Sequence, residues 1–493
     1  MREGVELMKK LEKSKYKDFL TKYIEHIITA LILIPVSIIF MIHPLNGDIR
    51  TYQGVARLAD YFGSFPTNID LAYESKPIAN RMLNYFLYKI SSIFTTFGTP
   101  EYEMLIKFIS ILCVIIICYY FSTKFENKYI FLLSVLAFLT PTNTLTLIPD
   151  WWAPLIALFA LTLFLTNKPS NHYLSGIMIT IMFLLKGPTI ILVIPIACAL
   201  YLLKDNDWLN CLKRGAISSS LFLIFILLCG YFKNIIPDMI LSTYYVHQIY
   251  YDFQTTLILL IQNLIPLYFC MPIFIAGLIG ACILYLKLTK NKEINKILML
   301  ILMWISSLLY IFIQNEFYLT HYLILLVPSI ISLILLSNKL IKQFITIIII
   351  IFIILTVVSI YETDKEPSIA NRIIENISAI QNQEHILYLD SGQAPYYFQS
   401  NTSCRFIQSL PFQRNTDIWN ITTTPYYQEN FKCIMDYQGK YIIMDGYLRT
   451  PEYSINGIWF EQNTSDNKLV MSKIQTEYKQ VWNEGWNIYE RRS

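Results

Sequence analysis

The sequence predicts a polytopic α-helical membrane protein with about eleven transmembrane helices, followed by a small C-terminal α/β domain. Of the 493 residues, 55% are hydrophobic and 15% are charged, whereas about a quarter of the residues in a soluble domain are charged. Apolar runs such as FITIIIIIFIILTVVSIY (344–361) are long enough to cross a bilayer as helices. The segment 362–493 is instead polar and aromatic, and about 130 residues suffice for a small domain.

The predicted spans follow the apolar runs along the chain. They are 24–43, 104–122, 128–142, 151–166, 172–186, 188–203, 213–233, 264–287, 296–313, 318–336 and 341–361. Residues 1–23 are charged, and the apolar run after them lacks the small-residue cleavage site of a signal peptide. We therefore expect that run to be retained as the first span.

Lysine and arginine mark one side of the predicted membrane protein. They collect in the N-terminal segment and in the connections 122–128, 202–214, 287–296 and 337–342. Basic connections stay in the cytoplasm, so these segments define the inner face of a cell-membrane protein. The expected parts are a cytoplasmic segment (1–23), a membrane domain (24–361) with a long external loop (44–103), and an extracytoplasmic domain (362–493).

The C-terminal segment has the pattern of a small α/β domain. The short strand-like runs HILYLD (385–390) and KYIIMD (440–445) are separated by turns and polar stretches. Cys404 and Cys433 are the only cysteines of this segment, and a disulfide between them could form. The other cysteines mostly stand singly in apolar runs, and no Cys/His cluster has the spacing of zinc ligands.

Ionisable residues gather on the predicted outer face. They are Asp48 after the first span, Glu74, Lys76 and Arg81 in the first loop, Asp150 and Lys186 at span ends, His247 among tyrosines, and Glu316 and His321 beside the tenth span. Charge at membrane depth is costly and therefore suggests function. A one-sided collection fits a site at the outer membrane–water boundary better than a transporter, whose ionisable groups cluster near the midplane.

Each of these residues also has a purely structural explanation. Asp48 and Asp150 could cap helices, and Lys186 could extend from a helix end toward water. His321 could be a hydrogen-bonded core histidine, and Glu316 a solvated turn residue. These explanations stay open at the level of the sequence.

The segment YESKPIANRMLNYFLYKI (73–90) combines charge with a helical pattern. Within 79–90, apolar residues recur at the three- and four-residue spacing of one helix face. The segment is too short and too charged to cross a bilayer, so we expect an interfacial helix in the membrane plane. Lys76 precedes it at headgroup depth, where an ammonium and a helix N-terminus both favour a lipid phosphate. A plain interfacial anchor is the alternative.

Three motifs together resemble a known family. They are GD after the first span (47–48), YESKPIAN (73–80) before the interfacial helix, and FYLTHYLILLVP (317–328). With them the chain resembles the polyprenyl-phosphate-sugar-dependent glycosyltransferases of the GT-C fold, above all the protein O-mannosyltransferases and the lipid A aminoarabinose transferases. One departure is that Ile49 follows Asp48, where protein mannosyltransferases usually show an adjacent acid pair.

The resemblance implies roles for the matching residues. Asp48 matches the loop aspartate proposed as the catalytic base, and Lys76 matches the lysine that contacts the lipid phosphate. Glu74 lies near a second acid of the family, from which the inserted Ser75 displaces it. His321 matches a histidine at a helix entry in the wider family.

The implied reaction moves a sugar from dolichyl or undecaprenyl phosphate to a glycan, lipid or protein acceptor outside the cell. A carboxylate takes the acceptor proton, and cations offset the charge of the departing phosphate. The candidates are Asp48 as base, Lys76, Arg81 and Lys186 for the phosphate, and Glu74, Asp150, His247, Glu316 and His321 in support. A single carboxylate implies direct, inverting displacement, and a retaining route stays open.

No cofactor is expected, because the donor carries its own leaving group and the first loop lacks a DxD motif for a divalent metal. This absence also argues against an oligosaccharyltransferase. The expected partners are the lipid-linked sugar, the acceptor and membrane lipids, and no nucleic acid. Two other functions stay open, namely a multi-pass transporter or lipid flippase for an envelope precursor, and a scaffold whose C-terminal domain binds a partner.

Overall fold

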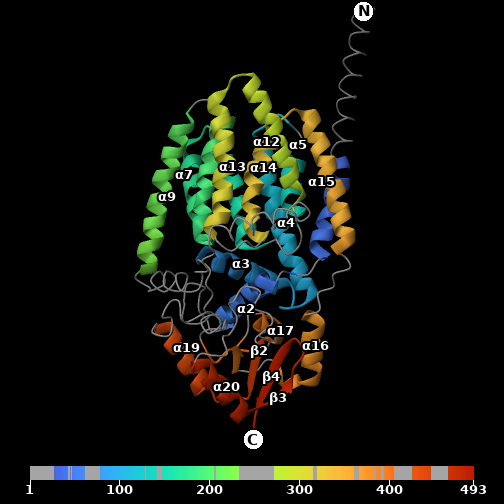
Figure 1. Ribbon diagram of the computed structural model, residues 1–493, viewed down its shortest axis with the longest axis vertical. Helices are drawn as coiled ribbons and strands as arrows, with labels where there is room; N and C mark the ends of the chain where they lie inside the picture. Colours follow the sequence, from blue (N-terminus) through green and yellow to red (C-terminus); the bar gives the residue numbers. More distant parts are fainter. Residues whose placement is uncertain are drawn as a thin grey trace, which may run out of the picture.

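The computed structural model describes residues 27–42, 45, 47–61, 78–127, 129–141, 147–204, 207–231, 271–314, 319–359, 366–381, 385–389, 393–404, 425–445 and 465–492. In this part of the chain, a bundle of long helices stands at one end and a small sheet at the other (Figure 1). Two helices of the first predicted loop lie between them.

The bundle consists of apolar helices that run roughly side by side (Figure 1). Its segments are Ile27–Ile42, α4 (Pro100–Ser122), α5 (Tyr129–Leu139), α6 (Pro149–Phe164), α7 (Pro169–Leu185), η3 (Gly187–Leu192) with α8 (Val193–Leu203), α9 (Trp208–Tyr231), α12 (Pro272–Lys290), α13 (Ile294–Gln314), η4 (Leu319–Leu325) with α14 (Leu326–Ile334), and α15 (Asn338–Ser359). Each predicted span overlaps one of these segments.

Four helices of the described residues are long and apolar enough to cross a membrane, namely α4, α9, α12 and α13. The segment Ile27–Ile42 and the bent continuation α2 (Gly47–Tyr61) would together make a fifth. On α9, the large apolar side chains of Leu221, Ile224 and Phe225 are more than half exposed, 64%, 52% and 59%. Lipid covers apolar surface of this kind in a membrane protein. The count of eleven spans stays a prediction.

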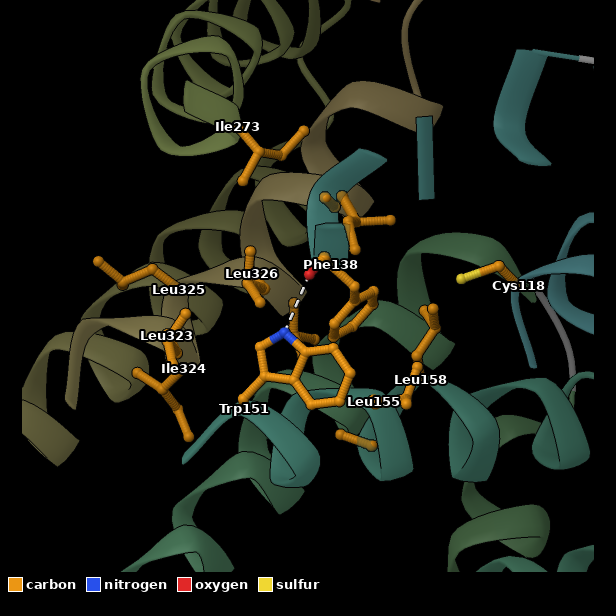
Figure 2. Packing of buried hydrophobic residues seen from close by; sticks show 14 of the residues in the cluster. Cys118, Phe138, Trp151, Leu155, Leu158, Ile273, Leu323, Ile324, Leu325 and Leu326 are labelled. Atoms are coloured by element: carbon orange, nitrogen blue, oxygen red, sulfur yellow. Dashed lines mark hydrogen bonds between the residues drawn. The ribbon is translucent and has the colours of Figure 1, made fainter. Parts of the chain in front are cut away.

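Trp151 of α6 lies in the core of the bundle (Figure 2). Its side chain is fully buried and meets the ring of Phe138 edge-on, with ring centroids 6.0 Å apart. The indole Nε1 donates a hydrogen bond to the Phe138 carbonyl at 3.0 Å, which avoids the penalty of a buried unpaired donor. Leu155 and Leu326 surround the ring in Figure 2. Because Asp150 precedes Trp151, this packing also holds the start of α6.

Helices α2 and α3 (Ile78–Phe94) are tied to the bundle by a buried polar network. Gln53 Nε2 of α2 donates to Asn84 Oδ1 of α3 at 2.9 Å. The hydroxyl of Tyr102, in α4, donates to Gln53 Oε1 at 2.6 Å. One glutamine therefore joins all three helices, and its donor and its acceptor both have partners, as a buried amide requires.

The α3 helix confirms the helix that the periodicity of 79–90 predicts. Its polar residues Asn80, Arg81 and Asn84 are buried against the protein, whereas Met82 and Phe86 are 45% and 55% exposed. A helix on a water-soluble protein shows the reverse arrangement. The exposed apolar face supports the prediction that this helix lies against lipid.

The C-terminal elements form a sheet covered by helices (Figure 1). The strands β1 (Ile386–Leu389), β2 (Tyr441–Asp445), β4 (Trp486–Arg491) and β3 (Tyr478–Trp482) lie in this spatial order, with β1 parallel to β2 and the other neighbours antiparallel. The helices are α16 (Glu366–Asn376), η5 (Ser378–Ile380), α17 (Ala394–Phe398), α19 (Pro425–Asp436) and α20 (Ser465–Glu477). The strand-like runs of the sequence become β1 and β2.

Strands β1 and β2 are mostly apolar because both faces of the sheet are buried. Along β2, Ile442 and Met444 point into one hydrophobic cluster, and Tyr441 and Ile443 into another. The sheet therefore has a core on each side.

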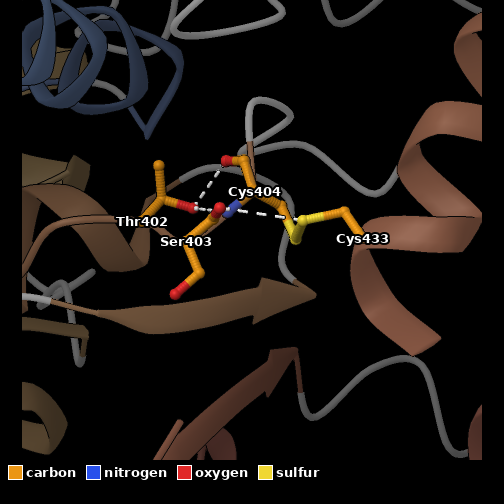
Figure 3. Close-up of a disulfide and its surroundings, with 4 residues drawn as sticks. All are labelled: Thr402, Ser403, Cys404 and Cys433. Atoms are coloured by element: carbon orange, nitrogen blue, oxygen red, sulfur yellow. Dashed lines mark hydrogen bonds between the residues drawn. A yellow bond between two sulfur atoms is a disulfide. The ribbon is translucent and has the colours of Figure 1, made fainter. Parts of the chain in front are cut away.

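Cys404 and Cys433 form a disulfide (Figure 3). It joins the segment after β1 to helix α19. The hydroxyl of Thr402 donates to the Cys404 carbonyl at 2.8 Å and accepts from the Cys404 amide at 3.2 Å, which closes a tight turn beside the disulfide. The pairing is the one that the sequence left open.

Replacing Cys404 and Cys433 together with alanine should destabilise the C-terminal part by roughly 3–4 kcal/mol, because the disulfide closes a loop with a sequence separation of 29 in the unfolded chain. The measurement is the thermal unfolding of the purified protein, monitored by limited proteolysis of the C-terminal part. Cys229→Ala, at an exposed free cysteine of α9, is the control. Equal unfolding temperatures for the double variant and the wild type would contradict the prediction.

Candidate active site

Asp150 is the centre of a buried polar cluster in the bundle. Its carboxylate accepts two hydrogen bonds from Lys186 Nζ, at 2.9 and 3.1 Å, and a third from the hydroxyl of Tyr310. The ring of His321 meets the ring of Tyr310 edge-on, with centroids 6.3 Å apart. The four side chains come from the start of α6, the end of α7, α13 and η4, so the cluster joins four separate elements.

The local sequence explains how Lys186 reaches Asp150. Helix α7 ends at Leu185, because Pro188 has no N–H to continue the helical hydrogen bonds. Lys186 then adopts an extended conformation before η3 begins. The hydroxyl of Thr189 donates to the Lys186 carbonyl at 2.6 Å, which holds this turn.

Two structural explanations that the sequence left open are wrong for this cluster. The N-cap position of α6 is Ile148, so Asp150 lies inside the first turn and its carboxylate binds side chains. Lys186 does not extend toward water, because its ammonium is held by Asp150 and its side chain is 14% exposed. His321 is buried, and its core role stays open.

Desolvation decides how stable such a cluster is. Two charges taken out of water stabilise a fold only when their geometry and further hydrogen bonds offset the lost hydration. Here both Asp150 oxygens accept from Lys186, and Tyr310 supplies the additional donor. The pair is therefore well satisfied as long as all three groups are present.

Asp48 lies in a different setting, in the first turn of α2, which begins at Gly47. Its side chain is exposed. A carboxylate in this position interacts favourably with the helix dipole, and it stays accessible to a second molecule. Such accessibility is what a base acting on a bound acceptor needs.

A second charged group stands beside the segment that carries Asp48. The carboxylate of Glu103, in the first turn of α4, accepts from the Leu45 amide at 2.8 Å and from Arg50 Nε at 2.9 Å. The hydroxyl of Tyr396, in α17, donates to the same carboxylate at 2.9 Å. Glu103 therefore joins the bundle, the first loop and the C-terminal part.

Arg81 lies on the buried face of α3 and is 8% exposed. Helix α3 packs against α7, whose last turn leads directly to Lys186. This packing brings the helix that carries Arg81 toward the end of the bundle where the Asp150 cluster lies. The predictions for Glu74, Lys76, His247 and Glu316 fall outside the described residues.

Four residues at or near these clusters were not predicted from the sequence. Arg50, Glu103 and Tyr310 take part in the clusters, and Lys107 interacts electrostatically with Glu103. Lys107 is fully buried in α4, with its ammonium 5.6 Å from the centroid of the Phe40 ring. A lysine and a glutamate near the start of a predicted span are a signal that could have found Lys107 and Glu103. A tyrosine in an apolar run gives no comparable signal.

The side chains of the described residues include no group of three or more histidine, cysteine, aspartate or glutamate residues that could hold a metal ion. The two acids in the clusters, Asp150 and Glu103, each bind a cation of the protein itself.

Two crystal structures of ArnT from Cupriavidus metallidurans share the fold. The apo structure is 13% identical with a TM-score of 0.58, and the match covers 95% of this chain and 98% of ArnT. The structure bound to undecaprenyl phosphate is 12% identical with a TM-score of 0.55, covering 93% and 97%. The likeness therefore runs through nearly the whole length of both chains.

The crystal structure of the Archaeoglobus fulgidus oligosaccharyltransferase tethered to an acceptor peptide with an NVT sequon is also similar, at 13% identity and a TM-score of 0.50, covering 94% of this chain and 74% of that one. No family model and no curated protein matches the sequence. The predicted GT-C membrane fold is confirmed, and identities this low establish the fold alone.

Asp150→Asn should destabilise the protein by about 3–5 kcal/mol, because it removes the negative charge that binds the largely buried Lys186 ammonium at 2.9 Å. Combining it with Lys186→Met should recover part of the loss. Unfolding temperature in detergent is the measurement, and Glu293→Gln, which breaks an exposed ion pair with Lys296, should leave it unchanged. An Asp150→Asn variant as stable as the wild type would disprove the role of the pair.

Proposed function

We propose that this chain is an integral-membrane glycosyltransferase that moves a sugar from a polyprenyl phosphate to an acceptor on the extracytoplasmic face. The observation that carries the proposal is the likeness to ArnT over almost the whole of both chains, including a structure of ArnT bound to undecaprenyl phosphate. A donor of this kind lies in the membrane, so its phosphate is met at the membrane surface, the depth at which α2 and α3 would lie.

Asp48 is the proposed catalytic base. It is exposed at the start of α2, where an acceptor hydroxyl can reach it. As the hydroxyl attacks the anomeric carbon, its proton passes to the Asp48 carboxylate while the sugar–phosphate bond breaks. A single carboxylate acting in this way gives direct displacement with inversion.

Lys76, Arg81 and Lys186 are the proposed cations for the donor phosphate. The negative charge on the phosphate grows as it departs, and fixed cations stabilise that charge. Lys186 is held in place by Asp150, so Asp150 acts in support by orienting it. Arg81 reaches the same end of the bundle through the packing of α3 on α7. Glu74, His247, Glu316 and His321 remain proposed supports.

The proposed orientation places the N-terminus in the cytoplasm and the C-terminal domain (362–493) outside the cell membrane, after a cytoplasmic segment (1–23) and a membrane domain (24–361). The lysine-rich turn between α12 and α13 lies at the end of the bundle opposite the C-terminal sheet (Figure 1), which supports this orientation. The disulfide favours an oxidising compartment for the sheet.

Transfer at the membrane surface is favoured over transport by the position of the charged pairs. A transporter keeps ionisable groups near the bilayer midplane. Among the described residues, Asp150 and Lys186 lie at the ends of their helices, and Glu103 lies in the first turn of α4. These charged side chains therefore gather at one end of the bundle.

Asp48→Asn should lower kcat for sugar transfer by about 10²–10⁴-fold, the usual contribution of a general base, with little change in KM for the donor. The assay uses full-length protein in lipid nanodiscs with dolichyl phosphate mannose or undecaprenyl phosphate aminoarabinose, and mass spectrometry of envelope glycans identifies the acceptor.

Asp60→Asn is the matched control, because Asp60 is an acid of the same helix that accepts from Lys89 at 2.9 Å. It should leave kcat unchanged. Near-normal turnover by the Asp48 variant would remove Asp48 as the base, and a wild-type protein that transfers neither sugar would remove the proposed function.

A further inference from the structure

The carboxylate of Glu103 binds residues on both sides of Asp48 in the sequence. Glu103 Oε2 accepts from the Leu45 amide, and Glu103 Oε1 accepts from Arg50 Nε. These two donors come three residues before and two residues after Asp48. The carboxylate therefore binds Leu45 before α2 and Arg50 in the first turn of α2, and charge-assisted hydrogen bonds of this kind are the strong ones.

Arg50 depends on this carboxylate. Its side chain is 2% exposed, and Glu103 Oε1 is an ion-pair partner of Arg50 Nε at 2.9 Å. Removing this negative charge would weaken the contacts that hold the buried guanidinium in place. Because Arg50 lies on α2 two residues from Asp48, a shift of Arg50 would move the start of that helix.

The C-terminal part takes part in the same cluster through α17. Tyr396 donates to Glu103 Oε1 at 2.9 Å, and its ring packs edge-on against Phe97, with centroids 5.1 Å apart. The ring centroid of the neighbouring Tyr397 lies 5.4 Å from Cζ of the Arg50 guanidinium. The cluster therefore contains side chains from the first loop, the bundle and the C-terminal part.

Helix α2 has residues that allow and stabilise its contact with α17. A Cβ at Gly54 would lie 3.2 Å from the Tyr396 backbone nitrogen, so a residue without a side chain allows α17 to approach closely. One turn further, the Arg57 guanidinium donates to the carbonyls of Gln399 and Ser400. Two separate contacts thus hold α17 and the following loop on α2.

We propose that Glu103 is a positioning residue for the transfer reaction, which holds Asp48 in its reactive place and couples that place to the docking of the C-terminal part through Tyr396. The inference rests on the proposed role of Asp48 as base. A displacement of about 1 Å at a reacting group can lower a rate by as much as 10²-fold, so a group that holds the turn acts on kcat without touching the substrate.

The first test is hydrogen–deuterium exchange of the full-length protein in nanodiscs, which needs no substrate. Glu103→Gln removes the negative charge that accepts from Leu45 and Arg50, so exchange in the peptide that covers 45–50 should speed up. Glu101→Gln, at the exposed glutamate two residues earlier in α4, should leave it unchanged. Unchanged exchange in the Glu103 variant would overturn the proposal.

The second test separates positioning from folding. With dolichyl phosphate mannose or undecaprenyl phosphate aminoarabinose, whichever the wild type uses, Glu103→Gln should lower kcat about 10- to 100-fold while KM for the donor changes less than about threefold. Tyr396→Phe, a milder change, should lower kcat about 3- to 10-fold. Tyr441→Phe removes a hydroxyl that donates to Glu490 in the sheet, and it should have no effect.

The outcomes distinguish the two proposals. Wild-type transfer together with an unchanged kcat in both variants overturns only the positioning role. A loss of activity that merely follows the loss of folded protein, or a raised KM at constant kcat, overturns it as well. A wild-type protein that transfers neither sugar overturns the proposed function, whatever the exchange result.

Discussion

The free-energy cost of burying charge among apolar helices determines how side chains pair at the end of the bundle where the candidate site lies. Each buried ion there needs a partner, and each partner comes from a distant part of the chain. Asp150 and Lys186 join the start of α6 to the end of α7, and Arg50 and Glu103 join α2 to α4. If one partner is lost, the other loses a counter-charge that offsets the cost of its burial. These two pairs therefore hold the elements around the site in a defined arrangement.

The helices of the first loop connect this arrangement to the predicted membrane surface. Helix α3 buries its polar residues and exposes Met82 and Phe86, so its apolar side is available to lipid while its polar side faces the protein. Gln53 then links α2 and α3 to Tyr102 of α4 through buried hydrogen bonds. In the proposed function, a lipid-borne donor meets the protein on this layer, between the apolar bundle and the polar C-terminal sheet.

Most of the fold could be predicted from the sequence, because hydrophobic periodicity depends only on residues that are close together in the chain. The apolar runs became the bundle helices, the spacing in 79–90 became α3, and the two strand-like runs became β1 and β2. The disulfide partners could be named because Cys404 and Cys433 were the only cysteines of the polar segment. The sequence also predicted the positions of Asp48, Asp150 and Lys186 at the ends of helices.

By itself, then, the sequence determined a membrane bundle, an amphipathic helix in the first loop and a candidate acid after the first span, since each depends on neighbouring residues. Only the tertiary structure decided which charges pair. Tyr396 meets Glu103 across 293 residues, and Tyr310 meets Asp150 across 160. A tyrosine in an apolar run looks the same whether its hydroxyl faces lipid or a buried carboxylate. The choice is made by how helices far apart in the chain pack, because burial forces each polar group to find a partner.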